Sequence, residues 1–101
     1  MQSQTLNLPR AQLRIRMDLA SEFDGLIKSA PGLLSANEAS EVREFVDGRQ
    51  YTLALEAFCA PLVSKNKHIA PELYNRIHGL CQQLDGVDPY LIASVRAIVR
   101  K

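Results

Sequence analysis

Glycine and proline interrupt this sequence at short intervals, and between the interruptions apolar residues recur every three or four positions. That spacing is the period of an amphipathic helix, whereas a half-buried strand alternates at every second residue. Leu and Ala make up 25 residues and Thr only two, so strong helix formers dominate. The 101 residues suffice for one domain. We therefore predict an all-α fold, a single small antiparallel helical bundle of about five helices over residues 1–101.

The first two helices have recognisable boundaries. Residues 1–8 are expected to fray, and the first helix to run from Pro9 to about Lys28. Gly25 predicts a kink or a split in it, because Gly costs ~1 kcal/mol in a helix interior. The segment Ser35-Ala36-Asn37-Glu38 reads as a capping box that starts the second helix. Gly48 is predicted to end that helix in the left-handed conformation.

The remaining three helices follow from the same signals. In the third helix Leu53 lies off the main apolar stripe, which predicts a central helix covered on two sides. Pro61 is expected to kink or end this helix. The fourth is predicted from Pro71 to Asp85-Gly86, and the fifth begins with Asp88 as N-cap before a proline. The main stripe of the third helix comprises Tyr51, Leu55, Phe58, Cys59 and Leu62.

No pattern typical of an enzyme or of a metal or cofactor site is found. Both cysteines, Cys59 and Cys81, lie on apolar stripes, where a free thiol behaves as a small hydrophobe. His68 and His78 have no carboxylate at metal-ligand spacing. All five glycines read as helix breaks rather than as a phosphate loop. We expect no catalysis and no cofactor.

The sequence also bears on the compartment. No apolar run reaches the length of a membrane span, and the uncharged start of the chain does not resemble a secretory signal. The two cysteines have no paired spacing, which is typical of a reducing compartment. These features predict a cytoplasmic protein that does not interact with a membrane.

Acidic residues concentrate in one part of the chain. Residues 18–56 hold eight acidic and three basic residues, although the whole chain has a net charge of +1. Such a surface attracts a basic protein partner, although it also fits a solvated helix face. The predicted partner-binding residues lie on the second helix and, if the first helix packs beside it, on that helix too: Glu38, Glu41, Glu44, Asp47, Glu22 and Asp24.

Two other functions remain open. The helices on either side of Gly48 have lengths close to those of a helix-turn-helix, so the chain could be a small DNA-binding regulator. However, only Arg49, Gln50 and Thr52 offer polar groups at the start of the second of these helices, so no nucleic-acid partner is expected. A helical adaptor that binds a peptide is the other alternative.

One part of the chain resembles a known family. The segment Gly-Arg-Gln-Tyr-Thr-Leu-Ala-Leu-Glu-Ala-Phe-Cys at 48–59 is similar to the "G-x-Y-x-L-A-L-E-x-L-C" helix of MafI-type immunity proteins. The segment Ile-Ala-Pro-Glu-Leu-Tyr-Asn-Arg-Ile at 69–77 resembles the next helix of that family. The similarity covers about 40 of the 101 residues, and no 34-residue helical repeat follows it.

The resemblance implies a function that the other patterns do not specify. It implies a bacterial immunity protein of a polymorphic toxin or contact-dependent growth inhibition system. Such a protein binds the C-terminal toxin domain, often a ribonuclease or other nuclease, in a stoichiometric complex. A cytoplasmic 1:1 heterodimer is then expected.

Overall fold

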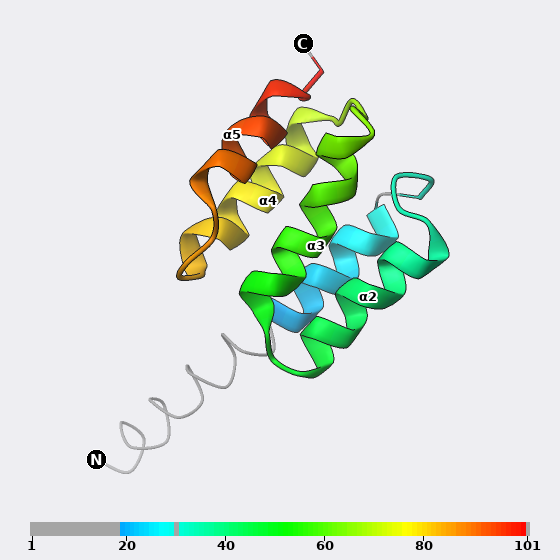
Figure 1. Cartoon of the computed structure of the whole chain (residues 1–101), viewed down its shortest axis with the longest axis vertical. Helices are drawn as coiled ribbons and strands as arrows, with labels where there is room; N and C mark the ends of the chain where they lie inside the picture. Colours follow the sequence, from blue (N-terminus) through cyan, green and yellow to red (C-terminus); the bar gives the residue numbers. More distant parts are fainter. Residues whose placement is uncertain (1–18, 30, 101) are drawn as a thin grey trace, which may run out of the picture.

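The computed structural model describes residues 19–29 and 31–100. A helical segment over 19–29 is followed by α2 (Ala36–Asp47), α3 (Tyr51–Ser64), α4 (Pro71–Gln83) and α5 (Pro89–Ala97). Successive helices alternate in direction, and α3 contacts α2, α4 and α5 (Figure 1). Within the described residues the prediction of an all-α antiparallel bundle of about five helices is therefore confirmed. The expected start at Pro9 and the fraying of residues 1–8 lie outside the described residues.

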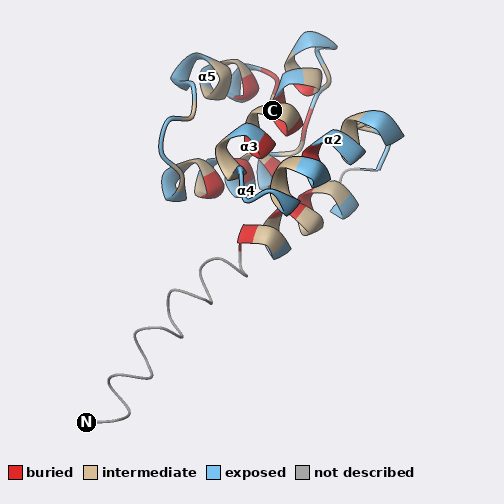
Figure 2. Cartoon of the chain, turned by 60° about the horizontal axis from the view of Figure 1, so that its bottom comes forward, coloured by how far each residue is buried: buried red, intermediate tan, exposed pale blue. Residues whose placement is uncertain are grey.

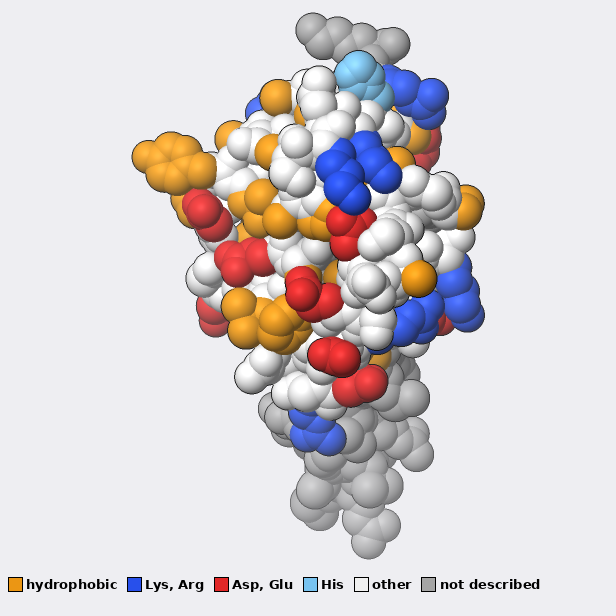
Figure 3. Space-filling view, turned by 45° about the vertical axis from the view of Figure 1, so that its right-hand side comes forward, with side chains coloured by type: hydrophobic (Ala, Val, Ile, Leu, Met, Phe, Trp, Pro, Cys, Tyr) orange, Lys and Arg blue, Asp and Glu red, His pale blue; other side chains and the backbone are white. Residues whose placement is uncertain are grey.

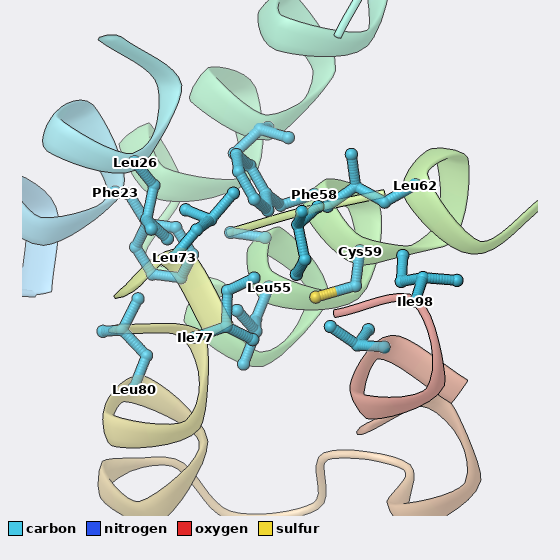
Figure 4. Close-up of a cluster of buried hydrophobic side chains, with 14 of the residues drawn as sticks. Phe23, Leu26, Leu55, Phe58, Cys59, Leu62, Leu73, Ile77, Leu80 and Ile98 are labelled. Atoms are coloured by element: carbon cyan, nitrogen blue, oxygen red, sulfur yellow. The ribbon is translucent and has the colours of Figure 1, made fainter. Parts of the chain in front are cut away.

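The core forms around α3 because this helix is apolar over most of its circumference. Its inner side packs against Phe23 and Leu26 of the segment 19–29, and against Ile77 and Leu80 of α4 (Figure 4). The buried parts of all the helices turn toward this centre, and the outer sides are exposed or half-buried (Figure 2). The buried residues of α3 are Ala54, Leu55, Phe58, Cys59 and Leu62.

Side-chain caps start two of the helices as predicted. The backbone N–H of Glu38 donates to Ser35 Oγ at 3.1 Å, and the N–H of Ser35 donates to Glu38 Oε1 at 2.8 Å, which completes the capping box of α2. Asp88 Oδ1 accepts from the N–H of Tyr90 at 2.9 Å at the start of α5. These contacts are local, so the sequence is sufficient to predict them.

The end of α2 differs from the prediction. Gly48 has φ −84°, and the left-handed residue is Arg49, with φ 60°. The N–H of Arg49 donates to Val46 O at 3.0 Å and that of Gln50 to Phe45 O at 2.8 Å. This pair of bonds is a Schellman motif, which requires the left-handed conformation one residue after Gly48.

Two further helix breaks do not occur where they were expected. The segment 19–29 remains helical through Gly25, and Gly79 lies inside α4, so the interpretation of all the glycines as helix breaks is wrong. Similarly, α3 continues through Pro61 and ends at Ser64. A proline at this position removes one backbone hydrogen bond of the last turn, and the packing of α3 against its neighbours compensates for that loss.

The C-terminal segment is tied to the connection between α3 and α4. The N–H of Ile69 donates to Ile98 O at 3.0 Å, and the N–H of Arg100 donates to Ile69 O at 2.8 Å. The resulting bridge pairs Ile69 with Val99 and holds α5 beside α4.

Candidate partner-binding surface

Three of the six predicted site residues form ion pairs inside the fold. Glu38 Oε2 accepts from Lys65 Nζ at 2.8 Å, which ties α2 to the residue after α3. Asp24 accepts from Lys28 on its own helix at 2.9 Å and from Arg43 of α2 at 3.2 Å. The carboxylates of Glu38 and Asp24 therefore already have cationic partners, which a binding protein would have to displace.

The third ion pair, that of Glu22, shows that the two acids of the first helix face different neighbours. Glu22 Oε2 lies 3.5 Å from Arg76 Nη2 of α4, whereas Asp24 faces Arg43 of α2. The helical segment 19–29 therefore does pack beside α2, but only Asp24 lies on the α2 side. The structure does not bring all six acids onto one surface.

Both Glu38 and Asp24 have lowered pKa values. The hydrogen bond from Lys65, followed by those involving the Ser35 backbone N–H, holds the pKa of Glu38 below its usual 4.5. The hydrogen bond from Lys28 is the largest cause that lowers the pKa of Asp24 from 3.8, and partial desolvation opposes it. These carboxylates stabilise the contacts between helices in their ionised form.

The other three predicted residues form an exposed acidic stripe. Glu41, Glu44 and Asp47 follow one another at intervals of three residues along the outer side of α2, and all are exposed. None of them takes part in a salt bridge within residues 19–29 and 31–100. We call these three residues the α2 stripe. Acidic side chains are prominent on the face of the molecule that contains α2 (Figure 3).

A hollow lies between the segment 19–29 and α2. Phe23, Ile27 and Val46 contribute apolar walls, and Asp47 also lines the hollow. The ion pair of Asp24 with Arg43 also lines this hollow, and the charges of these two side chains compensate each other. Asp47 is the member of the α2 stripe that connects the stripe to this hollow.

The structure places one cysteine in the core and one histidine beside an aromatic ring. Burial, and to a lesser degree the nearby Cys81 and Glu56, raises the pKa of Cys59 to about 12, so its thiol stays protonated. His78 is exposed and stacks on Tyr74 with ring centroids 5.8 Å apart. No three His, Cys, Asp or Glu side chains gather as metal ligands within the described residues.

Sequence reasoning missed two exposed side chains on the opposite flank of α3. Leu53 retains 44% exposure, so α3 is not covered on its second apolar side, and Tyr90 at the start of α5 retains 82%. Among the described residues these are the only large apolar side chains with such exposure. The position of Leu53 off the main stripe was the signal in the sequence. For Tyr90, the signal that could have predicted its exposure was its place in the first turn of a helix, directly after Asp88 and a proline.

Comparisons with known proteins identified no similar protein. No family model, no curated protein and no solved structure matches the chain. No helix within the described ranges has both the length and the apolar character needed to cross a membrane.

Proposed function

We propose that this chain is an immunity protein that binds and neutralises the toxin domain of a cognate bacterial polymorphic toxin. The toxin class comes from the resemblance of residues 48–77 to MafI-type immunity proteins. Those residues form α3, the connection after it and the first half of α4. The proposed complex is a cytoplasmic 1:1 heterodimer, and the protein performs no chemistry in it.

One structural observation supports binding of a basic partner, namely the α2 stripe. Glu41, Glu44 and Asp47 are exposed and carry charge that no described side chain neutralises. A nuclease needs cationic side chains to bind the phosphates of its substrate. An uncompensated acidic stripe attracts such a surface at long range and accelerates association.

Binding of DNA has less support. The helix α3, which would have to act as a recognition helix, contains no Lys or Arg between Tyr51 and Ser64 and directs five residues into the core. Recognition helices need cationic or polar side chains on their outer side to contact phosphates and bases. The acidic outer side of α2 would repel the DNA backbone.

The proposal is tested by protection in cells. The C-terminal toxin domain encoded directly upstream is expressed with and without this protein, and growth and RNA integrity are followed. Rescue of growth, together with a stable 1:1 complex in size-exclusion chromatography with light scattering, is the expected result. RNA that stays intact only on co-expression identifies a ribonuclease as the partner. Absence of both rescue and complex would refute the immunity function.

A further inference from the structure

The outer side of α3 is apolar and has no covering element in the described structure. Leu53 and Ala60 are exposed and Ala57 is half-buried, and their spacing places all three on one side of the helix. A helix side that faces water normally carries polar or charged residues. We call Leu53, Ala57 and Ala60, together with Tyr90, the α3 face.

Tyr90 belongs to this face because the loop before α5 is fastened to the flank of α3. Thr52 Oγ1 donates to Asp85 O at 2.8 Å, and the N–H of Asp88 donates to Glu56 Oε2 at 3.3 Å. Asp88 in turn caps the N–H of Tyr90 at 2.9 Å. These bonds place the start of α5, which carries the exposed side chain of Tyr90, beside the turn of α3 that follows Leu53.

Acidic side chains border the α3 face on both sides. Glu56, Asp85 and Asp88 lie along the flank toward α5. On the flank toward α2, Glu38 reaches Lys65 at the end of α3, and Glu41 follows Glu38 one turn further on the same side of α2. Apart from Glu38, none of these five acids takes part in a salt bridge within the described ranges. Hydrophobic and acidic side chains are interspersed on the side of the molecule that contains α2 (Figure 3).

We propose that the α3 face is the docking surface for an arginine-bearing basic surface of a protein partner. The aliphatic stems of arginine or lysine side chains would cover Leu53 and Ala60, and their charged ends would reach the acidic border. An arginine between Asp88 and Tyr90 would combine an ion pair with a contact to the aromatic ring. Tyrosine and arginine are, with tryptophan, enriched among the residues that contribute most to the binding energy of protein interfaces.

The charge of the border selects this occupant over others. Phosphates of a nucleic acid or of an anionic lipid surface would be repelled by Glu41, Glu56 and Asp88. A second copy of this chain would bring the same acidic border against itself, which also costs free energy. A cationic protein surface complements both the charge and the apolar centre of the α3 face.

This inference rests on the proposed function for the identity of the partner, which is the toxin domain encoded upstream. The test compares the affinity of that domain for the full wild-type chain, Leu53→Gln, Tyr90→Ala and the double variant by calorimetry. His78→Ala serves as the control, because it removes an exposed ring from α4. Thermal unfolding checks that each variant is folded. Because both altered side chains are exposed, the unfolding temperature should change little.

We expect Tyr90→Ala to raise Kd about 30-fold and Leu53→Gln about tenfold, as for central interface residues. His78→Ala is expected to leave Kd unchanged. If the toxin domain binds the wild-type chain and the double variant with the same Kd, the α3 face is not the docking surface, while the immunity function stands. Failure of the wild-type chain itself to bind would overturn both proposals.

Discussion

The guanidinium of Arg76 lies against Gly25, so closely that a Cβ atom on Gly25 would come within 2.6 Å of Arg76 Nη2. From this position the same side chain reaches Glu22 Oε2 at 3.5 Å and Ser29 Oγ at 3.4 Å. The glycine therefore does not break the helical segment 19–29. It provides the space through which α4 is linked to that segment.

The two glycines inside helices, Gly79 and Gly25, should respond differently to substitution by alanine. Gly79→Ala should raise the free energy of unfolding by about 0.5–1 kcal/mol, because a Cβ there meets no atom within 4 Å and alanine favours the helix. Gly25→Ala should gain less or lose stability, because Arg76 must leave its position. Urea unfolding followed by circular dichroism measures both, and equal gains would show that the contact of Arg76 does not constrain Gly25.

The left-handed residue after α2 predicts a stabilising substitution. Arg49 has φ 60°, a conformation that costs a non-glycine residue about 1 kcal/mol. Arg49→Gly should therefore raise the midpoint of urea unfolding. Asn66, with φ 50° after α3, is the matched site, and Asn66→Gly should change the midpoint less, because asparagine tolerates this conformation. The reverse order of the two effects would contradict the prediction.

Charge reversal tests the α2 stripe. Glu41→Lys with Glu44→Lys should lower the association rate with the toxin domain about tenfold at low salt and weaken its salt dependence, because electrostatic steering is lost. Surface plasmon resonance at several salt concentrations measures both effects. Glu72→Lys, an exposed acid in the first turn of α4, is the control. Unchanged association at low salt would remove the α2 stripe from the interface.

The lowered pKa of Glu38 predicts a loss of stability in acid. An acid whose folded pKa is depressed stabilises the fold above its unfolded pKa, and that contribution disappears as the pH falls through the folded value. The wild-type protein should therefore lose stability from about pH 4.5 downward, and Asp24 adds to the loss from 3.8. Glu38→Gln can keep the capping box but lacks the charge, so its urea midpoint should fall less over the same range. Parallel pH profiles for the two proteins would count against the ion pair with Lys65.

Burial of Cys59 predicts selective thiol chemistry. Its pKa of about 12 leaves almost no thiolate at pH 8, whereas Cys81 is half-buried. Reaction with a thiol-specific disulfide reagent should modify Cys81 first and Cys59 only after denaturation. The Cys59→Ser variant should keep the wild-type rate in the native state. Rapid modification of the native Cys81→Ser variant would show that Cys59 is accessible.

Local signals in the sequence were sufficient for most of the secondary structure. The capping box at Ser35 and Glu38 and the cap by Asp88 connect residues at most three positions apart, so their geometry follows from the chain itself. The apolar periodicity likewise places Phe58 and Ile77 in the core. The helix α2 ends at Gly48 as predicted, but the left-handed residue is Arg49. The segment 19–29 is not split at Gly25 and α3 does not end at Pro61, because packing and hydrogen bonding with neighbouring turns outweigh the intrinsic preferences of single residues.

The candidate binding surface depended on contacts between distant residues. By itself the sequence determined that α2 is acidic on its outer side and that Leu53 lies off the main stripe. Only the tertiary structure decided which acids remain free, because an ion pair between two helices forms only where those helices become neighbours. Glu22, Asp24 and Glu38 meet Arg76, Arg43 and Lys65, which lie 19 or more positions away in the sequence. Glu41, Glu44 and Asp47 meet no such partner in the described structure, and the helices that cover one side of α3 leave Leu53 exposed on the other.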